Sequence, residues 1–222
     1  MKILKFLFFS TIMCTANINA QDYDSAMKAA GMEDIATVDP TIRIDLMYAG
    51  TNNFVGEDMY GTLKKAYLHP EAAAGLAKAQ ATLKKEHPGY SLKVCDAARP
   101  MSVQKKMWDK VKGTAKSNYV SNPTRGGGQH NYGLAVDITI VDEKGDELPM
   151  GTPVDHLGYE SNIDMETDLV RRGIITENER QNRLLLRKVM RAGGFSTLRT
   201  EWWHFNFRSR AVAQSRYKRL DF

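Results

Sequence analysis

Gln129-His130-Asn131-Tyr132-Gly133-Leu134-Ala135-Val136-Asp137 is a stretch with two potential metal ligands, and Glu201-Trp202-Trp203-His204 adds more far downstream. His130 and Asp137 offer a nitrogen and an oxygen to a metal, and His204 offers a second nitrogen. Three protein ligands leave one coordination position for water, which is typical of a catalytic rather than a structural zinc ion. We therefore predict one zinc ion per chain at His130, Asp137 and His204, with the Glu201 carboxylate beside it and not among its ligands.

Both stretches alternate apolar and polar side chains, which is the period of a β-strand. From Leu134 onward this alternation predicts a half-buried strand whose Asp137 points away from the apolar face. Gly133 can adopt backbone angles closed to other residues, so it can turn the chain between His130 and this strand. Glu201 and His204 are three residues apart and would face opposite sides of a regular strand. The second strand must therefore begin or bend near Glu201 for both side chains to reach one metal.

A histidine and an aspartate seven residues apart are, taken alone, more often hydrogen-bonded surface groups than metal ligands. The second motif, in which His204 follows Glu201, shifts the balance toward a metal site. No cluster of cysteines is present that could form a closed, thiolate-rich zinc site instead.

The two motifs resemble those of a known enzyme family. His130, Gly133, Ala135 and Asp137, followed by Glu201-Trp202-Trp203-His204, are similar to the zinc motifs of the D-alanyl-D-alanine dipeptidases of the vancomycin-resistance type. These enzymes belong with the wall-directed D,D-carboxypeptidases and with the Hedgehog-like zinc fold, and the wider group shares both motifs. Stretches more particular to the dipeptidases extend the likeness from about Val38 to Phe207: Asp45-Leu46-Met47-Tyr48-Ala49, Asn53-Phe54-Val55-Gly56, Asp96-Ala97-Ala98-Arg99-Pro100, Pro149-Met150-Gly151-Thr152 with Asp155, and Gln181-Asn182-Arg183.

The resemblance implies roles for several residues. It implies zinc-dependent hydrolysis of D-Ala-D-Ala, with Glu201 as the base and Arg99 at the oxygen of the tetrahedral intermediate. It further implies that Asp155 accepts the ammonium group of the dipeptide, with Tyr48 as a second wall of the pocket. One departure stands out, because in the family a serine commonly precedes the first zinc histidine, whereas this chain has Gly128-Gln129. The substrate contact of that hydroxyl is therefore not carried over.

The expected fold class is α+β, a single domain with a central antiparallel sheet that carries the zinc site and flanking helices, of the Hedgehog/DD-peptidase type. Two other functions stay open. A D,D-carboxypeptidase or endopeptidase acting on peptidoglycan stem peptides would share both zinc motifs. A wall-binding module with a structural zinc is the non-enzymatic alternative, and the presence of both Glu201 and Arg99 argues against it, because a structural zinc needs neither.

Residues 1–20 have the composition of a secretory signal, with Lys2 and Lys5 before an apolar run and small or polar residues before Gln21. The apolar run is shorter than the roughly 20 residues that span a bilayer, so a retained anchor is not favoured. Lipid modification of Cys14 is not favoured either, because the preceding residues lack the small side chain normally required there. Cleavage after Ala20 would leave one domain, residues 21–222, in the periplasm or outside the cell.

Charge and cysteine content narrow the possible partners. The signal holds two lysines and no acid, so its removal lowers the formal net charge from +5 to +3. This charge is too small to indicate nucleic-acid binding. Cys95 is then the only cysteine, which excludes an internal disulfide, and its apolar neighbours predict a small core residue rather than a nucleophile.

Apolar spacing and capping residues predict the remaining elements. A strand is expected over residues 41–46, and helices over Pro70–Lys85 and from Thr176 to about Ala192, the second opened by a capping box. Another helix has Pro100 in its first turn, which puts Arg99 on a strand-to-helix connection. Residues 112–129 are predicted to be a mobile loop beside the zinc site, and the basic residues of 208–219 a solvated end.

Overall fold

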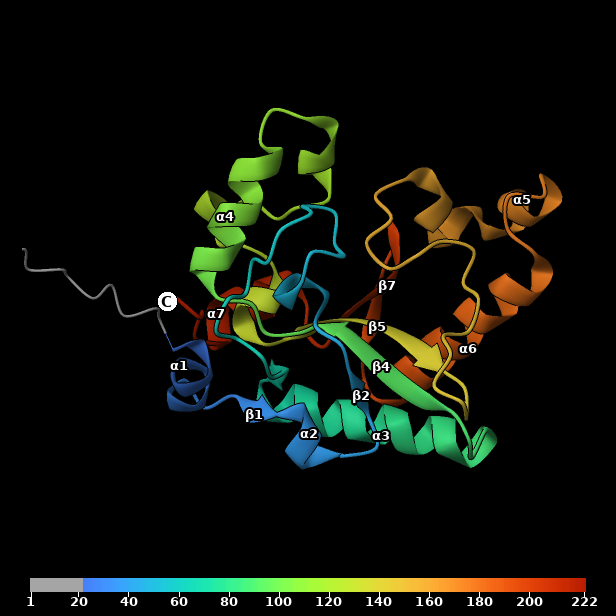
Figure 1. The fold of residues 1–222 in the computed structure, drawn as a ribbon, viewed down its shortest axis with the longest axis horizontal. Helices are drawn as coiled ribbons and strands as arrows, with labels where there is room; N and C mark the ends of the chain where they lie inside the picture. Colours follow the sequence, from blue (N-terminus) through green and yellow to red (C-terminus); the bar gives the residue numbers. More distant parts are fainter. Residues whose placement is uncertain (1–21) are drawn as a thin grey trace, which may run out of the picture.

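The structure is a computed structural model that describes residues 22–222 (Figure 1). Its centre is a five-stranded sheet in the order β2-β4-β5-β7-β6. The strands are β2 (Arg43–Ile44), β4 (Ser91–Asp96), β5 (Ala135–Val141), β6 (Ser196–Leu198) and β7 (Glu201–Asn206). Helices pack against this sheet, so the described part of the chain forms one α+β domain, as predicted.

The sheet is not wholly antiparallel, and this part of the prediction is wrong. The pairs β4–β5, β5–β7 and β6–β7 are antiparallel, but the edge strand β2 runs parallel to β4. β2 is also shorter than the strand predicted over residues 41–46. The reason is the connection, because the chain passes from β2 to β4 through α3 (Pro70–Glu86), and a crossover through a helix joins parallel strands.

The central strand β5 is buried along its whole length, whereas the alternation of its sequence predicted a half-buried strand. Val136, Ile138 and Ile140 belong to the hydrophobic core, as expected for the apolar face. Asp137 lies on the opposite face but is only 3% exposed, because His130 and His204 enclose its carboxylate. The polar side chain of Asp137 therefore marks an enclosed site and not a solvent-facing surface.

Two long helices, α3 and α6 (Glu177–Ala192), pack against each other beside the sheet (Figure 1). Both lie within one or two residues of the predicted bounds. The capping box predicted for α6 is present: Thr176 Oγ1 accepts from Glu179 N at 3.2 Å, and the Glu179 carboxylate accepts from Thr176 N at 2.6 Å. These two contacts satisfy backbone donors that the first turn of a helix leaves free.

The remaining elements surround this core. α4 (Met101–Val111) buries Val103, Met107 and Val111, while Pro100 precedes the helix instead of lying in its first turn. The smaller elements are α1 (Tyr23–Ala29), α2 (Ile35–Val38), α5 (Glu166–Arg171), α7 (Arg210–Arg216), and a two-stranded sheet of β1 (Glu33–Asp34) with β3 (Tyr67–Leu68).

Residues 112–129 form a connection with two short 3-10 helices, η2 (Ala115–Asn118) and η3 (Pro123–Arg125). The connection is tied to α4, because Gln104 Nε2 donates to the Ser121 carbonyl at 2.7 Å. It borders the site described below, as predicted, and its mobility stays a prediction.

Of the basic residues in 208–219, Arg210, Arg216 and Lys218 are exposed, as predicted, whereas the segment that follows them returns to the core. Leu220 is buried, and its N–H donates to the Asn131 carbonyl at 2.8 Å. The N–H groups of Met101 and Ser102 donate to the carbonyls of Leu220 and Phe222 at 2.9 and 3.1 Å. The apolar Leu220 and these backbone hydrogen bonds outweigh the basic character of the preceding residues.

The predicted signal at residues 1–20 lies outside the described residues. Within residues 22–222, we find no helix that combines the length and the apolar character needed to cross a membrane.

Candidate active site

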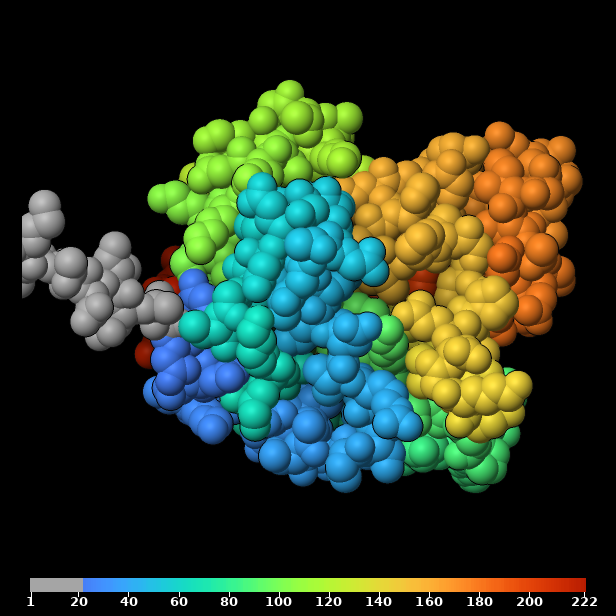
Figure 2. Space-filling view, viewed as in Figure 1, coloured from blue at the N-terminus to red at the C-terminus, as the bar shows by residue number. Residues whose placement is uncertain are grey.

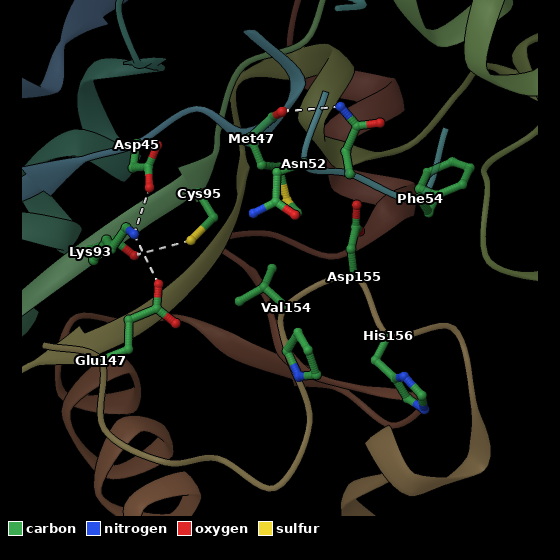
Figure 3. Close-up of a pocket in the computed structure, with 12 residues that line it drawn as sticks. Asp45, Met47, Asn52, Phe54, Lys93, Cys95, Glu147, Val154, Asp155 and His156 are labelled. Carbon is green, nitrogen blue, oxygen red and sulfur yellow. Dashed lines mark hydrogen bonds and ion pairs between the residues drawn. The ribbon is translucent and has the colours of Figure 1, made fainter. Parts of the chain in front are cut away.

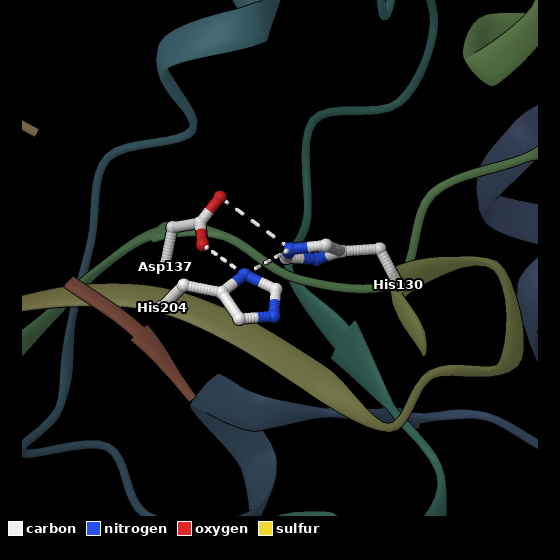
Figure 4. A group of neighbouring side chains, drawn as sticks. All are labelled: His130, Asp137 and His204. Atoms are coloured by element: carbon white, nitrogen blue, oxygen red, sulfur yellow. Dashed lines mark hydrogen bonds and ion pairs between the residues drawn. The ribbon is translucent and has the colours of Figure 1, made fainter. Parts of the chain in front are cut away.

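Three side chains from separate parts of the chain converge on one point (Figure 4). His130 comes from the short helix η4 (Gln129–Tyr132), Asp137 from β5 and His204 from β7. Asp137 and His204 are directly opposed across the two strands and so share a face of the sheet. Gly133 has a φ of 66°, the left-handed conformation that lets the chain turn from His130 into β5, as predicted.

The distances between the three ligand atoms fit a metal. His130 Nε2 lies 3.3 Å from His204 Nδ1 and 3.4 Å from Asp137 Oδ2. His204 Nδ1 lies 2.9 Å from Asp137 Oδ1. Ligand atoms of a tetrahedral zinc site, with bonds of about 2.0–2.1 Å, are separated by roughly 3.3 Å. The three side chains therefore already have nearly the spacing of a ligand set.

Hydrogen bonds behind the two histidines fix which ring nitrogen faces the site. His130 Nδ1 lies 2.7 Å from the Ala97 carbonyl, and His204 Nε2 lies 3.0 Å from Asn206 Oδ1. Each of these oxygens can accept a hydrogen bond from a ring N–H, so in the neutral imidazole the other nitrogen presents its lone pair to the common point. Such outer contacts are typical of histidines that bind metals.

Asp137 and His204 each stabilise the charged form of the other, a carboxylate and an imidazolium. Burial opposes ionisation of Asp137, but the two histidines lower the pKa of this carboxyl group well below its usual range. Burial also opposes a charge on His204, yet the hydrogen bond to Asp137 raises the pKa of the imidazole to about 9. A divalent cation would replace this proton, because imidazole binds a metal in its neutral form.

Glu201 begins β7 and lines the same cavity as His204. The pairing of β6 with β7 is irregular at this point, since Thr197 pairs with Phe205 whereas Leu198 pairs with Glu201. This bulge brings Glu201 to the side of His204, which is the bend that their spacing predicted. Glu201 Oε2 lies 4.0 Å from His204 Nδ1, and burial raises the pKa of Glu201 to about 7.

Arg99 lies on the connection between β4 and α4, as predicted. Its guanidinium group is held from two sides, because Nη2 contacts the Asp96 carboxylate and Nη1 donates to Gln104 Oε1 at 3.0 Å. It also lies over the Tyr48 ring, 5.1 Å from the centroid. Its Nε atom is buried and has no hydrogen-bond partner within residues 22–222. Arg99 is therefore a fixed, enclosed cation and not a surface ion pair.

Asp96 and Gln104 are not among the site residues predicted from the sequence. Asp96 is fully buried, accepts from the Tyr60 hydroxyl and from Arg99, and lies 3.6 Å from His130 Nδ1. The signal that could have identified it is a carboxylate three residues before Arg99. Asp96 thus orients Arg99 beside the potential metal ligands.

Asp155 and Tyr48 meet at another part of the cavity. The Tyr48 hydroxyl donates to Asp155 Oδ2 at 2.5 Å. Among residues 22–222, Asp155 is the only residue other than glycine with a positive φ, which is 66°. This backbone conformation is strained, and such strain is often found at functional sites. Burial, reinforced by the charge of Asp137, raises the pKa of Asp155 to about 7. A cationic group placed beside Asp155 would favour its ionised form.

One cavity of about 330 Å³ brings together all seven residues predicted to form the site. They are Tyr48, Arg99, His130, Asp137, Asp155, Glu201 and His204. In Figure 2 the surface is hollowed between the cyan segment that follows η1 (Met47–Ala49) and the golden segment that follows β5, and red atoms show at the floor of the hollow. The seven side chains come from segments that are far apart in the sequence.

A second cavity, of about 340 Å³, lies beyond Phe54 and Asp155, which line both cavities (Figure 3). Lys93 in this second cavity bridges Asp45 and Glu147, with Nζ to oxygen distances of 2.6 and 2.9 Å. The two cavities are thus neighbours separated by one aromatic ring and one carboxylate.

Cys95 and His156 also line the second cavity. Cys95 is buried, as predicted, and burial raises the pKa of its thiol well above its usual range. His156 Nε2 lies 3.1 Å from Glu160 Oε2, and His156 is not part of the His130–Asp137–His204 cluster.

Arg183 of α6 anchors the segment that carries Asp155. Its side chain is fully buried, with Nε donating to the Met150 carbonyl at 2.6 Å and Nη1 to the Glu160 carbonyl at 3.1 Å. Its guanidinium group also lies 5.6 Å from the centroid of the Trp202 ring, next to Glu201 in the chain. One side chain thus fastens both ends of the Asp155 segment to the helix layer.

The site and the fold together define a class of protein. Two imidazoles and a carboxylate converge on the strands of a sheet, with a further carboxylate and a buried guanidinium group beside them. The three ligand atoms could hold a metal ion, and the neighbouring carboxylate and guanidinium group are of the kinds that metal-dependent hydrolases use.

Comparison with known proteins identifies the family. The family model of peptidase M15, described as D-ala-D-ala dipeptidase, matches residues 28–220. The chain is 32% identical over 172 residues to the D-alanyl-D-alanine dipeptidase of Escherichia coli (strain K12), which covers 78% of this chain and 82% of the relative. It is 28% identical over 183 residues to the D-alanyl-D-alanine dipeptidase of Enterococcus faecalis (strain ATCC 700802 / V583), over 74% of this chain and 85% of the relative. The chain belongs to the D-Ala-D-Ala dipeptidase family of peptidase M15 and is a metallopeptidase.

Single substitutions should distinguish the metal ligand His204 from Glu201, which lies beside the metal site without binding the metal. His204→Ala should lose the metal, because two remaining ligands bind a divalent ion weakly, whereas Glu201→Ala should retain one metal ion per chain and lose turnover. Metal content after zinc loading and gel filtration measures both outcomes, with His156→Ala as the matched histidine control. Full occupancy in His204→Ala would show that the ligand set is wrong.

Proposed function

We propose that the chain hydrolyses the D-alanyl-D-alanine dipeptide to two D-alanines, with one zinc ion held by His130, Asp137 and His204. The observation that carries this proposal is the convergence of these ligands with Glu201 and Arg99 in one cavity. Its volume of about 330 Å³ suits a small ligand. We also propose that the sheet and its ligands follow the Hedgehog/DD-peptidase arrangement.

The donor set supports zinc as the metal. Two imidazoles and one carboxylate suit a borderline divalent ion, and no thiolate stands among these ligands. Both histidines are already oriented through their second ring nitrogens by Ala97 and Asn206. When bound, zinc would supply Lewis acidity and lower the pKa of a coordinated water toward about 7.

Glu201 is proposed as the general base. It takes a proton from the attacking water and returns it to the leaving amine as the peptide bond breaks. Three carboxylates line the cavity, and Asp137 is a ligand while Asp155 is bound to Tyr48. Glu201 is the remaining one, close to His204 but outside the ligand cluster.

Arg99 is proposed to stabilise the negative charge that develops on the carbonyl oxygen during attack. Its fixed position supports this role, because Asp96 and Gln104 hold the guanidinium group before any substrate arrives. A preorganised cation of this kind needs no reorganisation during the reaction, which is the condition for strong stabilisation of a transition state.

Arg99→Ala should lower kcat roughly 100- to 1000-fold, the usual cost of losing one group that stabilises an oxyanion. KM should change much less, since the charge develops only in the transition state. Steady-state kinetics on D-Ala-D-Ala measure both constants, with the exposed Arg199→Ala as the matched control. A raised KM with an unchanged kcat would instead make Arg99 a ground-state binder.

Asp155 is proposed to accept the ammonium group of the dipeptide, with the Tyr48 hydroxyl beside it. The contact between Tyr48 and Asp155 places a half-buried carboxylate where a cation would stabilise it. Phe54 and Asp155 line both cavities, so a peptide extended beyond the ammonium group would have to pass these two side chains. A charged hydrogen bond to the ammonium group could contribute about 1.5–3 kcal/mol.

Wild-type protein should cleave D-Ala-D-Ala at least about 10-fold faster than N-acetyl-D-Ala-D-Ala, because acetylation removes the charge that Asp155 recognises. It should leave L-Ala-L-Ala largely uncleaved, as the family of D,D-specific enzymes implies. Asp155→Asn should narrow the difference between the free and the acetylated dipeptide, whereas the exposed control Asp146→Asn should not. Comparable cleavage of both peptides by the wild type would favour a D,D-carboxypeptidase.

We further propose that the predicted signal directs export and that the substrate is dipeptide or peptide released during turnover of the cell wall. Destroying D-Ala-D-Ala before it enters wall precursors would require the enzyme in the cytosol. An exported enzyme would meet products of wall breakdown, so salvage or remodelling is the proposed role.

Cell fractionation with sequencing of the amino terminus tests the export proposal. The protein should be found in the periplasm or medium with Gln21 as its first residue, because signal removal follows Ala20. An uncleaved form confined to the cytosol would contradict export and would support a role upstream of wall synthesis.

A further inference from the structure

Gly128 lies two residues before His130, and Ser121 fills the space that a side chain at Gly128 would occupy. A Cβ atom on Gly128 would lie 2.7 Å from Ser121 Oγ and 3.2 Å from Ser121 Cβ. The φ of Gly128 is −110°, which any residue can adopt, so a side chain here is opposed by the lack of space and would need Ser121 to move. The departure at Gly128-Gln129 seen in the sequence thus has a structural counterpart in Ser121.

Ser121 is connected to Arg99 through one buried side chain. The Gln104 amide nitrogen donates to the Ser121 carbonyl at 2.7 Å, and the Gln104 amide oxygen accepts from Arg99 Nη1 at 3.0 Å. Gln104 is 1% exposed, and both of its polar atoms are satisfied by these contacts. The backbone at Ser121 is therefore held in a fixed relation to the guanidinium group of Arg99.

The hydroxyl of Ser121 is available to a ligand. Ser121 is half-buried and lines the active-site cavity, and its Oγ has no hydrogen bond to any residue of the described chain, 22–222. The Tyr48 hydroxyl in the same cavity is already committed to Asp155. Ser121 thus offers a free donor beside the turn that carries His130.

We propose that Ser121 binds the substrate by donating a hydrogen bond from its hydroxyl to the carboxylate of the dipeptide, an inference that rests on the proposed function. If the ammonium group lies at Asp155 and the scissile carbonyl at Arg99 and Glu201, the carboxylate extends toward the opposite rim. That rim is formed where residues 119–129 meet the start of α7, and it includes Ser121, Gln129 and the cation Arg210.

The two rims lie on different sides of the site. Figure 1 shows the connection that follows α4 on one side of β7 and the segment that follows β5 on the other. Arg210 Nη2 donates to the Arg125 carbonyl at 2.9 Å, and Gln129 Nε2 donates to the Arg208 carbonyl at 3.3 Å, so the Ser121 rim is braced by α7. Its positive charge and free hydroxyl suit a carboxylate, whereas the Asp155 rim suits an ammonium group.

The test is an exchange of side chains between the two positions. Ser121→Ala should raise KM for D-Ala-D-Ala so that kcat/KM falls roughly 10- to 100-fold, with kcat nearly unchanged, because the contact exists before and during the reaction. Gly128→Ser alone should also impair binding, since its Cβ meets Ser121. The double variant Ser121→Gly with Gly128→Ser should recover to within a few-fold of wild type, because the hydroxyl then enters the same space from the other position.

Ser117→Ala is the matched control, as its hydroxyl donates within the same connection to Thr114 and does not line the cavity. D-Alanine ethylamide, which keeps the ammonium group but has no acceptor in place of the carboxylate, should compete with D-Ala-D-Ala with the same Ki in wild type and Ser121→Ala. An unchanged KM in Ser121→Ala, a double variant no better than the worse single one, or unequal Ki values would overturn the proposal. Hydrolysis of D-Ala-D-Ala by the wild type tests the proposed function separately and does not depend on Ser121.

Discussion

The pairing of Asp137 with His204 across β5 and β7 is the constraint on which the site depends. Side chains of a strand alternate between faces, so a slip of one residue between these strands would place the two ligands on opposite sides of the sheet. The apolar residues of β5 prevent such a slip, because it would move Val136 and Ile138 out of the core. The packing energy of the core thus also fixes the geometry of the ligands.

A second level of organisation begins at Asp96, a buried carboxylate that contacts Tyr60 and Arg99 and lies close to His130. A buried charge is tolerated only when its hydrogen bonds are satisfied, so Asp96 and Arg99 hold each other in place. Through Gln104 the same set of contacts reaches Ser121. The ligand turn, the guanidinium group and the rim of the cavity are therefore connected by hydrogen bonds that exist without a substrate, which is what a preorganised site requires.

The sequence predicts those structural features that depend on residues close together in the chain. The capping box at Thr176 and the alternation around Asp137 depend on neighbours within a few residues, and the structure contains both. The parallel edge strand β2 and the full burial of β5 depend on segments far away in the sequence, and the pattern of the chain does not reveal them. Glu201 is the clearest example of what the sequence leaves open. Its spacing from His204 indicates a bend in the strand, but only the pairing of Glu201 with Leu198 shows where the bulge lies.

The docking of Leu220 against Asn131 has a consequence for the order of events during synthesis. β5 emerges from the ribosome long before β7, and until β7 is made one edge of this very apolar strand has no partner. An unpaired edge of this kind can associate with other chains, so the nascent protein must be kept unfolded or shielded. The last ligand and the segment that braces the ligand turn both arrive late. The three ligands are all available only once His204 has been made, so a complete metal site cannot form earlier in synthesis.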